Sequence, residues 1–255
     1  MLVNKNEQLL RWHGSKRQLA PTIVRLFPRG YEDLVYVEPF CGSASVFWCK
    51  QHSKVEVLND LDEELVNFLM TVKMHPRELA RTLRLLPNSR SLFARFMDCG
   101  GSGSSIVRAG RFCYLAQTSF GGLRGHWAPG GRNGKPNSLH RLPQRFYRWA
   151  KRLARTYLEC APWQEVIATH DSPQALFYLD PPYPDTKGYG RPFGWKDWRE
   201  LRNVLDRVKG KFVLSGPGNA RMKLLWRGYH TRTTAIMASL DPNGRIQKEL
   251  LVWNY

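Results

Sequence analysis

The 255-residue sequence lacks long hydrophobic runs, paired-cysteine motifs and histidine motifs for metal binding. No apolar stretch approaches the roughly 18 residues of a membrane-spanning helix, so we expect no membrane insertion. The five cysteines form no Cys-x-x-Cys pair and no cysteine–histidine cluster at zinc spacing, and the seven histidines include no His-Glu-x-x-His. We therefore expect reduced thiols and no protein-bound metal ion. The first residues also lack the apolar core of a secretory signal, which predicts a cytoplasmic location.

Acidic residues are scarce relative to basic ones. The chain contains 39 Lys and Arg against 21 Asp and Glu, which leaves a formal charge of +18 at pH 7. An excess of this size attracts polyanions over long range, so nucleic acid is the expected partner. An anionic lipid surface, or a basic protein that its charge merely keeps in solution, is the alternative.

Short β-branched and aromatic runs are present in the first and last parts of the chain. Leu34–Val37 and Val55–Leu58 predict two strands, and Leu65, Phe68 and Leu69 recur at helical spacing after the second. Three later strands are predicted over residues 175–179, 211–214 and 249–253, with a helix over 195–208. This strand and helix order is typical of a mainly parallel α/β sheet.

Arginine becomes dense between residues 74 and 162, which indicates a module inserted into the sheet domain. Within it, the spacing of Phe146, Trp149 and Leu153 predicts the apolar face of a helix over residues 142–155. The other faces are expected to carry the basic residues Arg145, Arg148, Lys151, Arg152 and Arg155. Such a helix can face phosphate, or it can be an ordinary solvated helix. We predict a discontinuous domain of residues 1–73 and 163–255 and an insert of residues 74–162.

Asp180-Pro181-Pro182-Tyr183 directly follows the predicted strand 175–179. Ligands of open α/β sheets bind at this carboxyl edge, and prolines lack a backbone N–H donor. The Asp180 carboxylate and the Pro181 carbonyl are therefore candidate acceptors for the two N–H bonds of an exocyclic amine. Holding both bonds favours a more tetrahedral, nucleophilic nitrogen, with Tyr183 stacked on the base. A turn with Tyr183 in the core is the alternative interpretation.

A turn of small residues, Glu38-Pro39-Phe40-Cys41-Gly42-Ser43, follows the first predicted strand, and small side chains let a ligand approach the backbone. Asp60 lies 18 residues after Gly42 (60 minus 42), near the roughly 20-residue offset at which an acid binds ribose hydroxyls. Together the turn and the acid predict a nucleoside site. Asp62 is a second candidate acid, although a helix N-cap explains it equally well. A nicotinamide oxidoreductase fits the sheet and the acid, but not the proline pair.

These motifs resemble those of the Dam-type DNA adenine-N6 methyltransferases. That family has an aromatic-x-Gly-x-Lys element, a Glu-Pro-Phe-x-Gly turn, an acid after the second strand, and Asp-Pro-Pro-Tyr. All four occur here in that order, as Trp12–Lys16, Glu38–Gly42, Asp60 and Asp180–Tyr183. The similarity also includes residues 111–115, 119–123 and 249–255, so it spans nearly the whole chain. The sequence departs from the family where Ser43-Ala44-Ser45 follows Gly42 in place of further glycine.

The resemblance implies a Rossmann-like S-adenosylmethionine-dependent methyltransferase sheet with an inserted, mainly helical DNA target-recognition domain. It implies site-specific transfer of a methyl group from S-adenosylmethionine to N6 of a flipped adenine in double-stranded DNA. The implied catalytic residues are Asp180, Pro181, Pro182 and Tyr183. The implied cofactor-binding residues are Trp12, Gly14, Lys16, Glu38, Pro39, Phe40, Gly42, Ser43, Asp60 and Asp180.

The resemblance also places the DNA contacts in the insert, where Thr118–Trp127 is similar to the family's DNA-contacting hairpin. An enzyme that acts on a base in a duplex must extrude it, and Trp127 can fill or wedge the stack. Arg124 can read a guanine edge or hold a phosphate. The expected DNA-binding residues are Ser119, Arg124, His126, Trp127, Arg132, Arg145 and Arg148. We expect association with the nucleoid, in a restriction system, a mobile element or a regulatory circuit.

Three other activities stay open. Cytosine-N4 methylation would use the same amine activation, but that group usually has Ser where Asp180 stands. Protein-glutamine methylation usually has Asn there, and the charge of +18 favours nucleic acid. A DNA-binding protein whose catalysis has lapsed conflicts with the intact Asp180 and Tyr183, although the glycine-poor turn is compatible with it.

Overall fold

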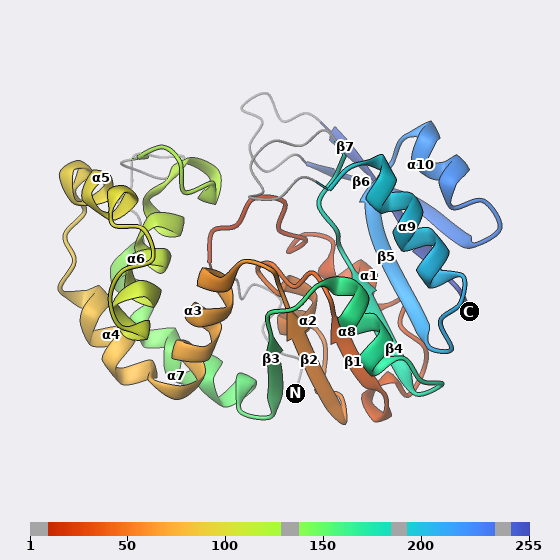
Figure 1. The fold of residues 1–255 in the computed structure, drawn as a ribbon, viewed down its shortest axis with the longest axis horizontal. Coiled ribbons are helices and arrows are strands. Elements are labelled where there is room, and N and C mark those ends of the chain that lie inside the picture. Colours follow the sequence, from red (N-terminus) through yellow and green to blue (C-terminus); the bar gives the residue numbers. More distant parts are fainter. Residues whose placement is uncertain (1–9, 129–137, 185–192, 238–245) are drawn as a thin grey trace. The chain divides into compact units, whose positions relative to one another are not determined.

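The computed structural model describes residues 10–128, 138–184, 193–237 and 246–255 (Figure 1). They form two compact units, of which the first contains residues 16–61 and 161–255 and the second contains residues 10–15 and 62–160. The predicted α/β fold with a Rossmann-like sheet is confirmed by the strand order β3-β2-β1-β4-β5-β7-β6. Helix α3 (Glu63–Met74), which we predicted with the sheet domain, belongs to the second unit.

The first unit contains the central strands of the sheet. β1 (Val35–Glu38) pairs in parallel with β2 (Val55–Asn59) and with β4 (Ala175–Leu179), and β4 pairs in parallel with β5 (Lys211–Pro217). The final strand β7 (Ile246–Trp253) runs antiparallel between β5 and β6 (His230–Met237). The carboxyl ends of β1, β2 and β4 therefore meet at one edge, where Gly42, Asp60 and Asp180 follow their strands.

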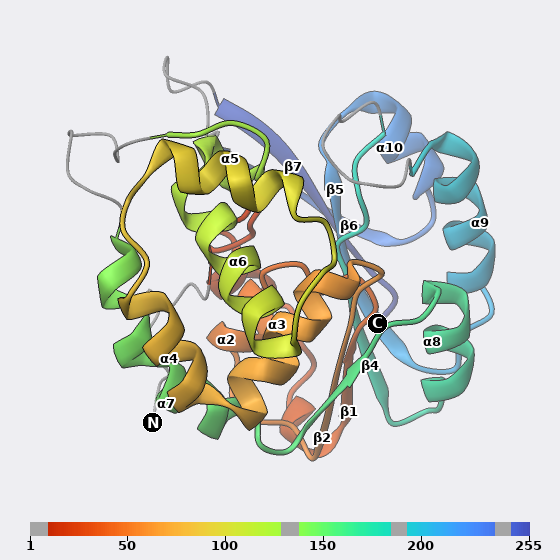
Figure 2. The ribbon, with the colours of Figure 1, turned by 60° about the vertical axis from the view of Figure 1, so that its left-hand side comes forward.

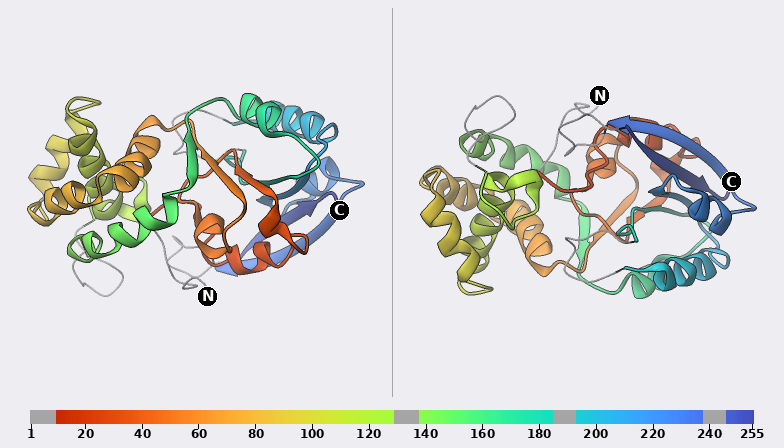
Figure 3. Two further views of the ribbon diagram at one scale, coloured as in Figure 1. Left: turned by 90° about the horizontal axis from the view of Figure 1, so that it is seen from below. Right: turned by 90° about the horizontal axis from the view of Figure 1, so that it is seen from above.

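Helices of the first unit cover both faces of this sheet (Figure 3). On one face, the apolar side chains of Val57, Val37, Phe177 and Phe212 lie side by side across four neighbouring strands. These side chains are buried in one core with residues of α8 (Trp163–His170) and α9 (Trp195–Leu205). The opposite face carries α1 (Ala20–Val24) and α2 (Ser45–Cys49). A 3₁₀ turn (Tyr31–Asp33) and α10 (Ala220–Leu225) complete the unit. The alternation of side chains along each strand produces these two apolar layers.

The second unit is mainly helical, as predicted (Figure 2). Its helices are α3, α4 (Pro76–Arg84), α5 (Arg90–Asp98), α6 (Ser105–Thr118) and α7 (Pro143–Leu153). Two 3₁₀ turns (Phe120–Gly122 and Ser138–Arg141) lie between α6 and α7, and strand β3 (Thr156–Glu159) follows α7. Its core joins Phe68 of α3 to Phe112 of α6 and Phe146 of α7, with ring centroids 5.7 Å and 6.3 Å apart.

Helix α7 tests the predicted basic helix. Its apolar face is confirmed, since Phe146, Trp149 and Leu153 are all buried. The expectation that Arg152 lies on an outer face is wrong, because that side chain is only 8% exposed. Position 152 is three residues after the buried Trp149, so both side chains lie on the same side of the helix.

Within the described ranges, no helix is long and apolar enough to cross a membrane.

Candidate active site

Asp180 begins the loop that leaves the carboxyl end of β4. Its Oδ1 accepts hydrogen bonds from the Lys16 ammonium and the Ser215 hydroxyl, both at 2.9 Å. Ser215 lies on the neighbouring strand β5, and its hydroxyl is also 2.9 Å from the hydroxyl of Tyr178. The carboxylate is therefore held from two sides through one oxygen. Its other oxygen, Oδ2, accepts no hydrogen bond from the residues that the structure describes.

The two prolines after Asp180 have different environments. The carbonyl of Pro182 accepts a hydrogen bond from the indole N–H of Trp198 at 3.2 Å, which ties the loop to helix α9. The carbonyl of Pro181 accepts none from any residue in the described ranges. The loop therefore keeps one main-chain acceptor beside Asp180, as the proline pair predicts.

Tyr183, at the end of the motif, is attached to the last strand of the sheet. Its hydroxyl donates a hydrogen bond to Oε2 of Glu249 on β7, and the Lys16 ammonium lies 4.8 Å from its ring centroid. Glu249 is only 1% exposed, and its other oxygen accepts from the Gln247 amide at 3.2 Å. Burial raises the pKa of Glu249 to about 7, against the opposing influence of Lys16. Lys16 thus links both ends of the Asp180–Tyr183 loop.

The glycine turn after β1 is held by Asp60. The N–H of Gly42 donates to Oδ2 of Asp60 at 2.8 Å, so the two features that predict a nucleoside site lie together. The turn is tight, with positive φ at both Gly42 (46°) and Ala44 (51°). Ser43 is buried, with its hydroxyl 2.8 Å from that of Ser45. Cys41, Ser43 and Ala44 are thus buried, whereas Gly42 is partly exposed.

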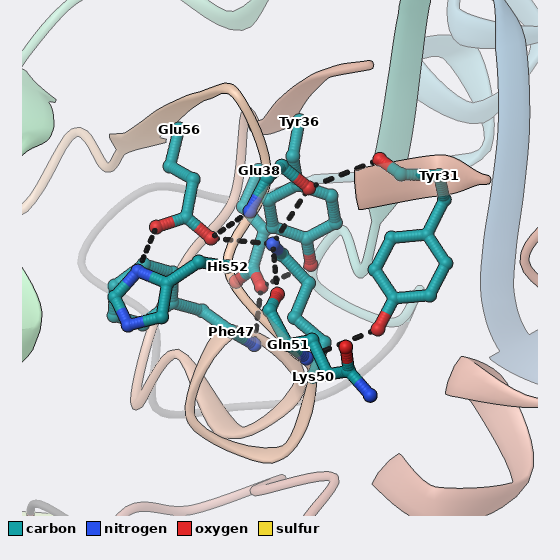
Figure 4. A network of polar contacts seen from close by, with 9 residues as sticks. Tyr31, Tyr36, Glu38, Phe47, Lys50, Gln51, His52 and Glu56 are labelled. Carbon is teal, nitrogen blue, oxygen red and sulfur yellow. Dashed lines mark hydrogen bonds and ion pairs between the residues drawn. The ribbon is translucent and has the colours of Figure 1, made fainter. Parts of the chain in front are cut away.

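Glu38, at the end of β1, is buried among polar partners (Figure 4). Its Oε1 accepts hydrogen bonds from the Tyr36 hydroxyl at 2.5 Å and from the Phe47 N–H at 2.9 Å. Burial raises the pKa of Glu38 to about 8 despite these donors. The Lys50 ammonium lies 4.1 Å from the centroid of the Tyr36 ring and 2.5 Å from the buried Glu56 carboxylate. This network fixes the strand end that precedes the turn.

The remaining predicted cofactor residues lie in both units. Asn59 donates from its amide to the Pro39 carbonyl at 2.9 Å, and the half-buried Phe40 packs 6.1 Å from Trp163 between ring centroids. Trp12 and Gly14 belong to the second unit, where Gly14 is exposed and has a φ of 72°. Lys16, which we predict to bind cofactor, has its ammonium group 2.9 Å from Oδ1 of Asp180.

The predicted DNA-contacting residues also differ in their environments. His126 and Arg148 are exposed, Arg145 is partly exposed, and Trp127 packs 5.7 Å from Phe93 between ring centroids. Ser119 is buried, and its hydroxyl accepts the N–H of Arg124 at 2.9 Å. Arg132 lies outside the described residues. His126 and Arg148 are thus at the surface, whereas Ser119 has a structural contact.

Sequence reasoning missed two residues of the Asp180–Tyr183 surroundings, Ser215 and Glu249. Ser215 follows the predicted strand 211–214, and Glu249 begins the predicted strand 249–253, so neither position belongs to a motif. A weak signal was available in Glu249, because a carboxylate in an otherwise apolar closing strand needs a partner.

In the described parts of the chain, no group of three His, Cys, Asp or Glu side chains lies close enough together to hold a metal ion. All five cysteines are free thiols, and burial raises the pKa of the Cys113 thiol, which keeps it unreactive.

Comparison with known proteins adds three similarities. Residues 12–234 match the family of D12 class N6 adenine-specific DNA methyltransferases. The type II methyltransferase M1.LlaDCHI of Lactococcus lactis subsp. cremoris is 27% identical over 288 residues, which cover 100% of this chain and 99% of that protein. A solved rRNA methylase from Streptococcus thermophilus is 9% identical with a TM-score of 0.39, covering 93% of this chain and 96% of that one. Because this TM-score is low, the fold is assigned from the strand order of the sheet alone.

Proposed function

The chain belongs to the D12 class of N6 adenine-specific DNA methyltransferases, and from this premise we propose how its residues methylate adenine. The observation that carries the proposal is the Asp180 carboxylate, oriented through Oδ1 by Lys16 and Ser215 beside the Pro181 carbonyl. The class implies DNA as the substrate.

The exocyclic nitrogen of adenine is a poor nucleophile because its lone pair is delocalised into the ring. We propose that Oδ2 of Asp180 accepts one of its N–H bonds and that the Pro181 carbonyl accepts the other. Two acceptors favour a tetrahedral nitrogen and stabilise the positive charge that develops on it. When N6 is methylated it must lose one proton, and the Asp180 carboxylate can take it.

Lys16, Ser215 and Glu249 prepare this site before the substrate arrives. Lys16 and Ser215 hold one oxygen of Asp180, and Glu249 holds the hydroxyl of Tyr183, so neither side chain must be ordered when adenine binds. The ring of Tyr183 would stack on a flipped base. A preorganised site of this kind lowers the barrier without a covalent intermediate.

We propose S-adenosylmethionine as the cofactor, and the turn after β1 fits it. The residues that would hold it in the first unit are Lys16, Glu38, Pro39, Phe40, Gly42, Ser43 and Asp60. The backbone of the turn approaches the sheet edge, and Asp60 provides a carboxylate there for ribose hydroxyls. The family resemblance adds Trp12 and Gly14. When bound, the cofactor supplies an electrophilic methyl group on a sulfonium.

The similarity to a type II methyltransferase supports methylation at a defined sequence in double-stranded DNA. The formal charge of +18 supports the same partner, since phosphate contacts supply much of the affinity for DNA. Such an enzyme would act in the cytoplasm, where it would associate with the nucleoid.

The test uses methyl-labelled S-adenosylmethionine, duplex DNA and two proteins, the natural chain and Asp180→Ala. The natural chain is expected to label DNA, with N6-methyladenine as the labelled nucleoside after digestion. Asp180→Ala should lose at least about 100-fold in rate, the scale of removing one preorganised electrostatic group, while binding DNA nearly as well. Equal rates for the two proteins would refute the role of Asp180, and N4-methylcytosine as the product would refute the target base.

A further inference from the structure

Arg124 lies in the hairpin of residues 119–127 (the recognition hairpin), and its guanidinium is already engaged within the protein. Its Nη2 contacts Oδ2 of Asp62 at 2.7 Å. The guanidinium carbon lies 4.7 Å from the ring centroid of Phe112 and 5.3 Å from that of Trp12. An arginine that combines a charged hydrogen bond with two aromatic contacts is strongly held.

The backbone of the recognition hairpin directs Arg124 into this position. Arg124 has a φ of 61°, which a non-glycine residue rarely adopts, and its N–H donates to the buried Ser119 hydroxyl at 2.9 Å. Ser119 and Trp127 form an antiparallel bridge, and the Phe120 N–H donates to the His126 carbonyl at 2.9 Å. The bridge and the hydrogen bond thus hold the two ends of the recognition hairpin together. Backbone strain at a charged residue is retained when the surrounding contacts require that conformation.

A second contact joins the recognition hairpin to the segment that contains Trp12. Gly122 has a φ of 76°, and a Cβ atom there would lie 2.5 Å from the Arg11 carbonyl oxygen and 2.9 Å from the Trp12 nitrogen. Only glycine allows two backbones to approach this closely. The backbone of the recognition hairpin therefore packs directly against residues 11–12, and this contact does not depend on the Arg124 side chain.

Asp62 serves two structural functions at once. Its Oδ1 accepts the N–H groups of Glu64 and Leu65, at 3.1 Å and 3.2 Å, and so caps helix α3. Its Oδ2 binds Arg124. The first turn of α3 and the recognition hairpin are joined through this one carboxylate.

We propose that Arg124 is a positioning residue that anchors the recognition hairpin to Asp62 and Trp12, and that it does not read a base. This proposal rests on the proposed function, DNA methylation, and on the expectation from the family resemblance that the hairpin contacts DNA. In a DNA complex, Arg124 would keep its contact with Asp62, and the exposed His126 would be left to meet the DNA. A base-reading arginine would instead have to abandon a carboxylate and two aromatic rings.

The experiment compares the natural chain with Arg124→Ala, Asp62→Asn and the double variant. Asparagine is as good an N-cap as aspartate, so Asp62→Asn preserves the cap of α3 while removing the charge that binds Arg124. Each protein methylates a pool of duplexes with randomised sequence around adenine, and sequencing of the modified molecules gives the preference at every position. DNA affinity is measured separately on one fixed duplex by titration.

We expect Arg124→Ala and Asp62→Asn each to weaken DNA binding by about tenfold with the sequence preference unchanged. The double variant should be no weaker than either single variant, because both changes remove the same anchor. Arg108→Ala is the matched control, since it removes the Arg108–Glu64 ion pair of the same unit, 2.7 Å long, outside the hairpin. It should leave both readouts unchanged.

A base-reading Arg124 predicts a different pattern. Arg124→Ala would then relax the preference at one position by at least about fivefold, while Asp62→Asn would keep it, and that result overturns the proposal. Additive losses in the double variant overturn it as well. If Arg124→Ala does not fold, Gly122→Ala takes its place in the same comparison. The added methyl group would separate the hairpin from residues 11–12, so the loss of DNA affinity should equal that of Asp62→Asn. Failure of the proposed function is distinguishable, because the natural chain would then methylate no adenine at all.

Discussion

The two units of the molecule place their charged side chains differently. In the first unit, several charged groups at the sheet are buried beside partners, as for Lys16 with Asp180, Lys50 with Glu56, and Glu249 with Tyr183. In the second unit, most arginines lie exposed on helices, as Arg77, Arg81 and Arg84 do on α4. A buried charge persists only where partners offset its lost hydration. The first arrangement therefore fixes a geometry, and the second provides a charged surface whose effect depends on salt.

The largest expected effect is on stability, from breaking a buried pair. Lys50→Met leaves the Glu56 carboxylate, 3% exposed, without its ammonium partner. We expect the free energy of unfolding to fall by about 3–5 kcal/mol, as measured by urea denaturation. Arg108→Met breaks the half-exposed pair with Glu64 in the second unit and should cost about 1 kcal/mol or less. Equal losses for the two variants would remove the distinction between the units.

A second prediction concerns the pH dependence of stability. Because the pKa of Glu38 is raised to about 8 from 4.5, the folded protein binds its proton more tightly than the unfolded chain does. Its contribution to stability is complete below pH 4.5 and is lost as pH rises through 8. Glu38→Gln should therefore flatten the fall in unfolding free energy between pH 5 and 8, by a few kcal/mol across that range. Parallel curves for the two proteins would contradict the buried, protonated Glu38.

A third, smaller effect is expected on catalysis from Glu249. Its pKa of about 7 means that it loses its negative charge as pH falls below neutrality, so its hold on the Tyr183 hydroxyl changes. The natural chain should show kcat decreasing below about pH 7. Glu249→Gln should lower kcat at pH 8 by about tenfold and remove this acidic limb, with little change in KM for DNA. An unchanged pH profile in the variant would show that another group titrates.

The smallest expected effect concerns the exposed arginines. Arg148→Gln on α7 should reduce the slope of log Kd against log salt by about 1, if Arg148 contacts one phosphate. Arg199→Gln, an equally exposed arginine on α9 of the first unit, is the control and should leave the slope unchanged. DNA titrations at several salt concentrations measure both slopes. The opposite ranking would place the DNA-binding surface on the first unit.

The sequence predicts buried, apolar elements of the fold better than polar ones. Strand β4 was predicted with its observed bounds because all five of its residues are buried and apolar. Strand β6 was not predicted, since its sequence, His-Thr-Arg-Thr-Thr-Ala-Ile-Met, is mostly polar. It is an edge strand held by main-chain pairing with β7, which leaves no hydrophobic signature.

The candidate site shows the same limit in another form. The Asp180–Tyr183 motif is local, so its chemistry was accessible from residue types alone. Its partners Ser215 and Glu249 lie 35 and 66 residues away from Asp180 and Tyr183, respectively, on strands that the sheet brings alongside. Arg124 illustrates the converse, because a motif that suggests DNA contact does not reveal the Asp62 carboxylate 62 residues before it.

The central claim is that Asp180 and the Pro181 carbonyl together hold the amine of a flipped adenine. The most direct measurement is a structure of the protein with duplex DNA and an unreactive analogue of S-adenosylmethionine. We predict N6 of the adenine at about 3 Å from both Asp180 Oδ2 and the Pro181 oxygen, with Lys16 still on Oδ1. A complex in which a flipped adenine binds with its amine directed away from both acceptors would contradict the account.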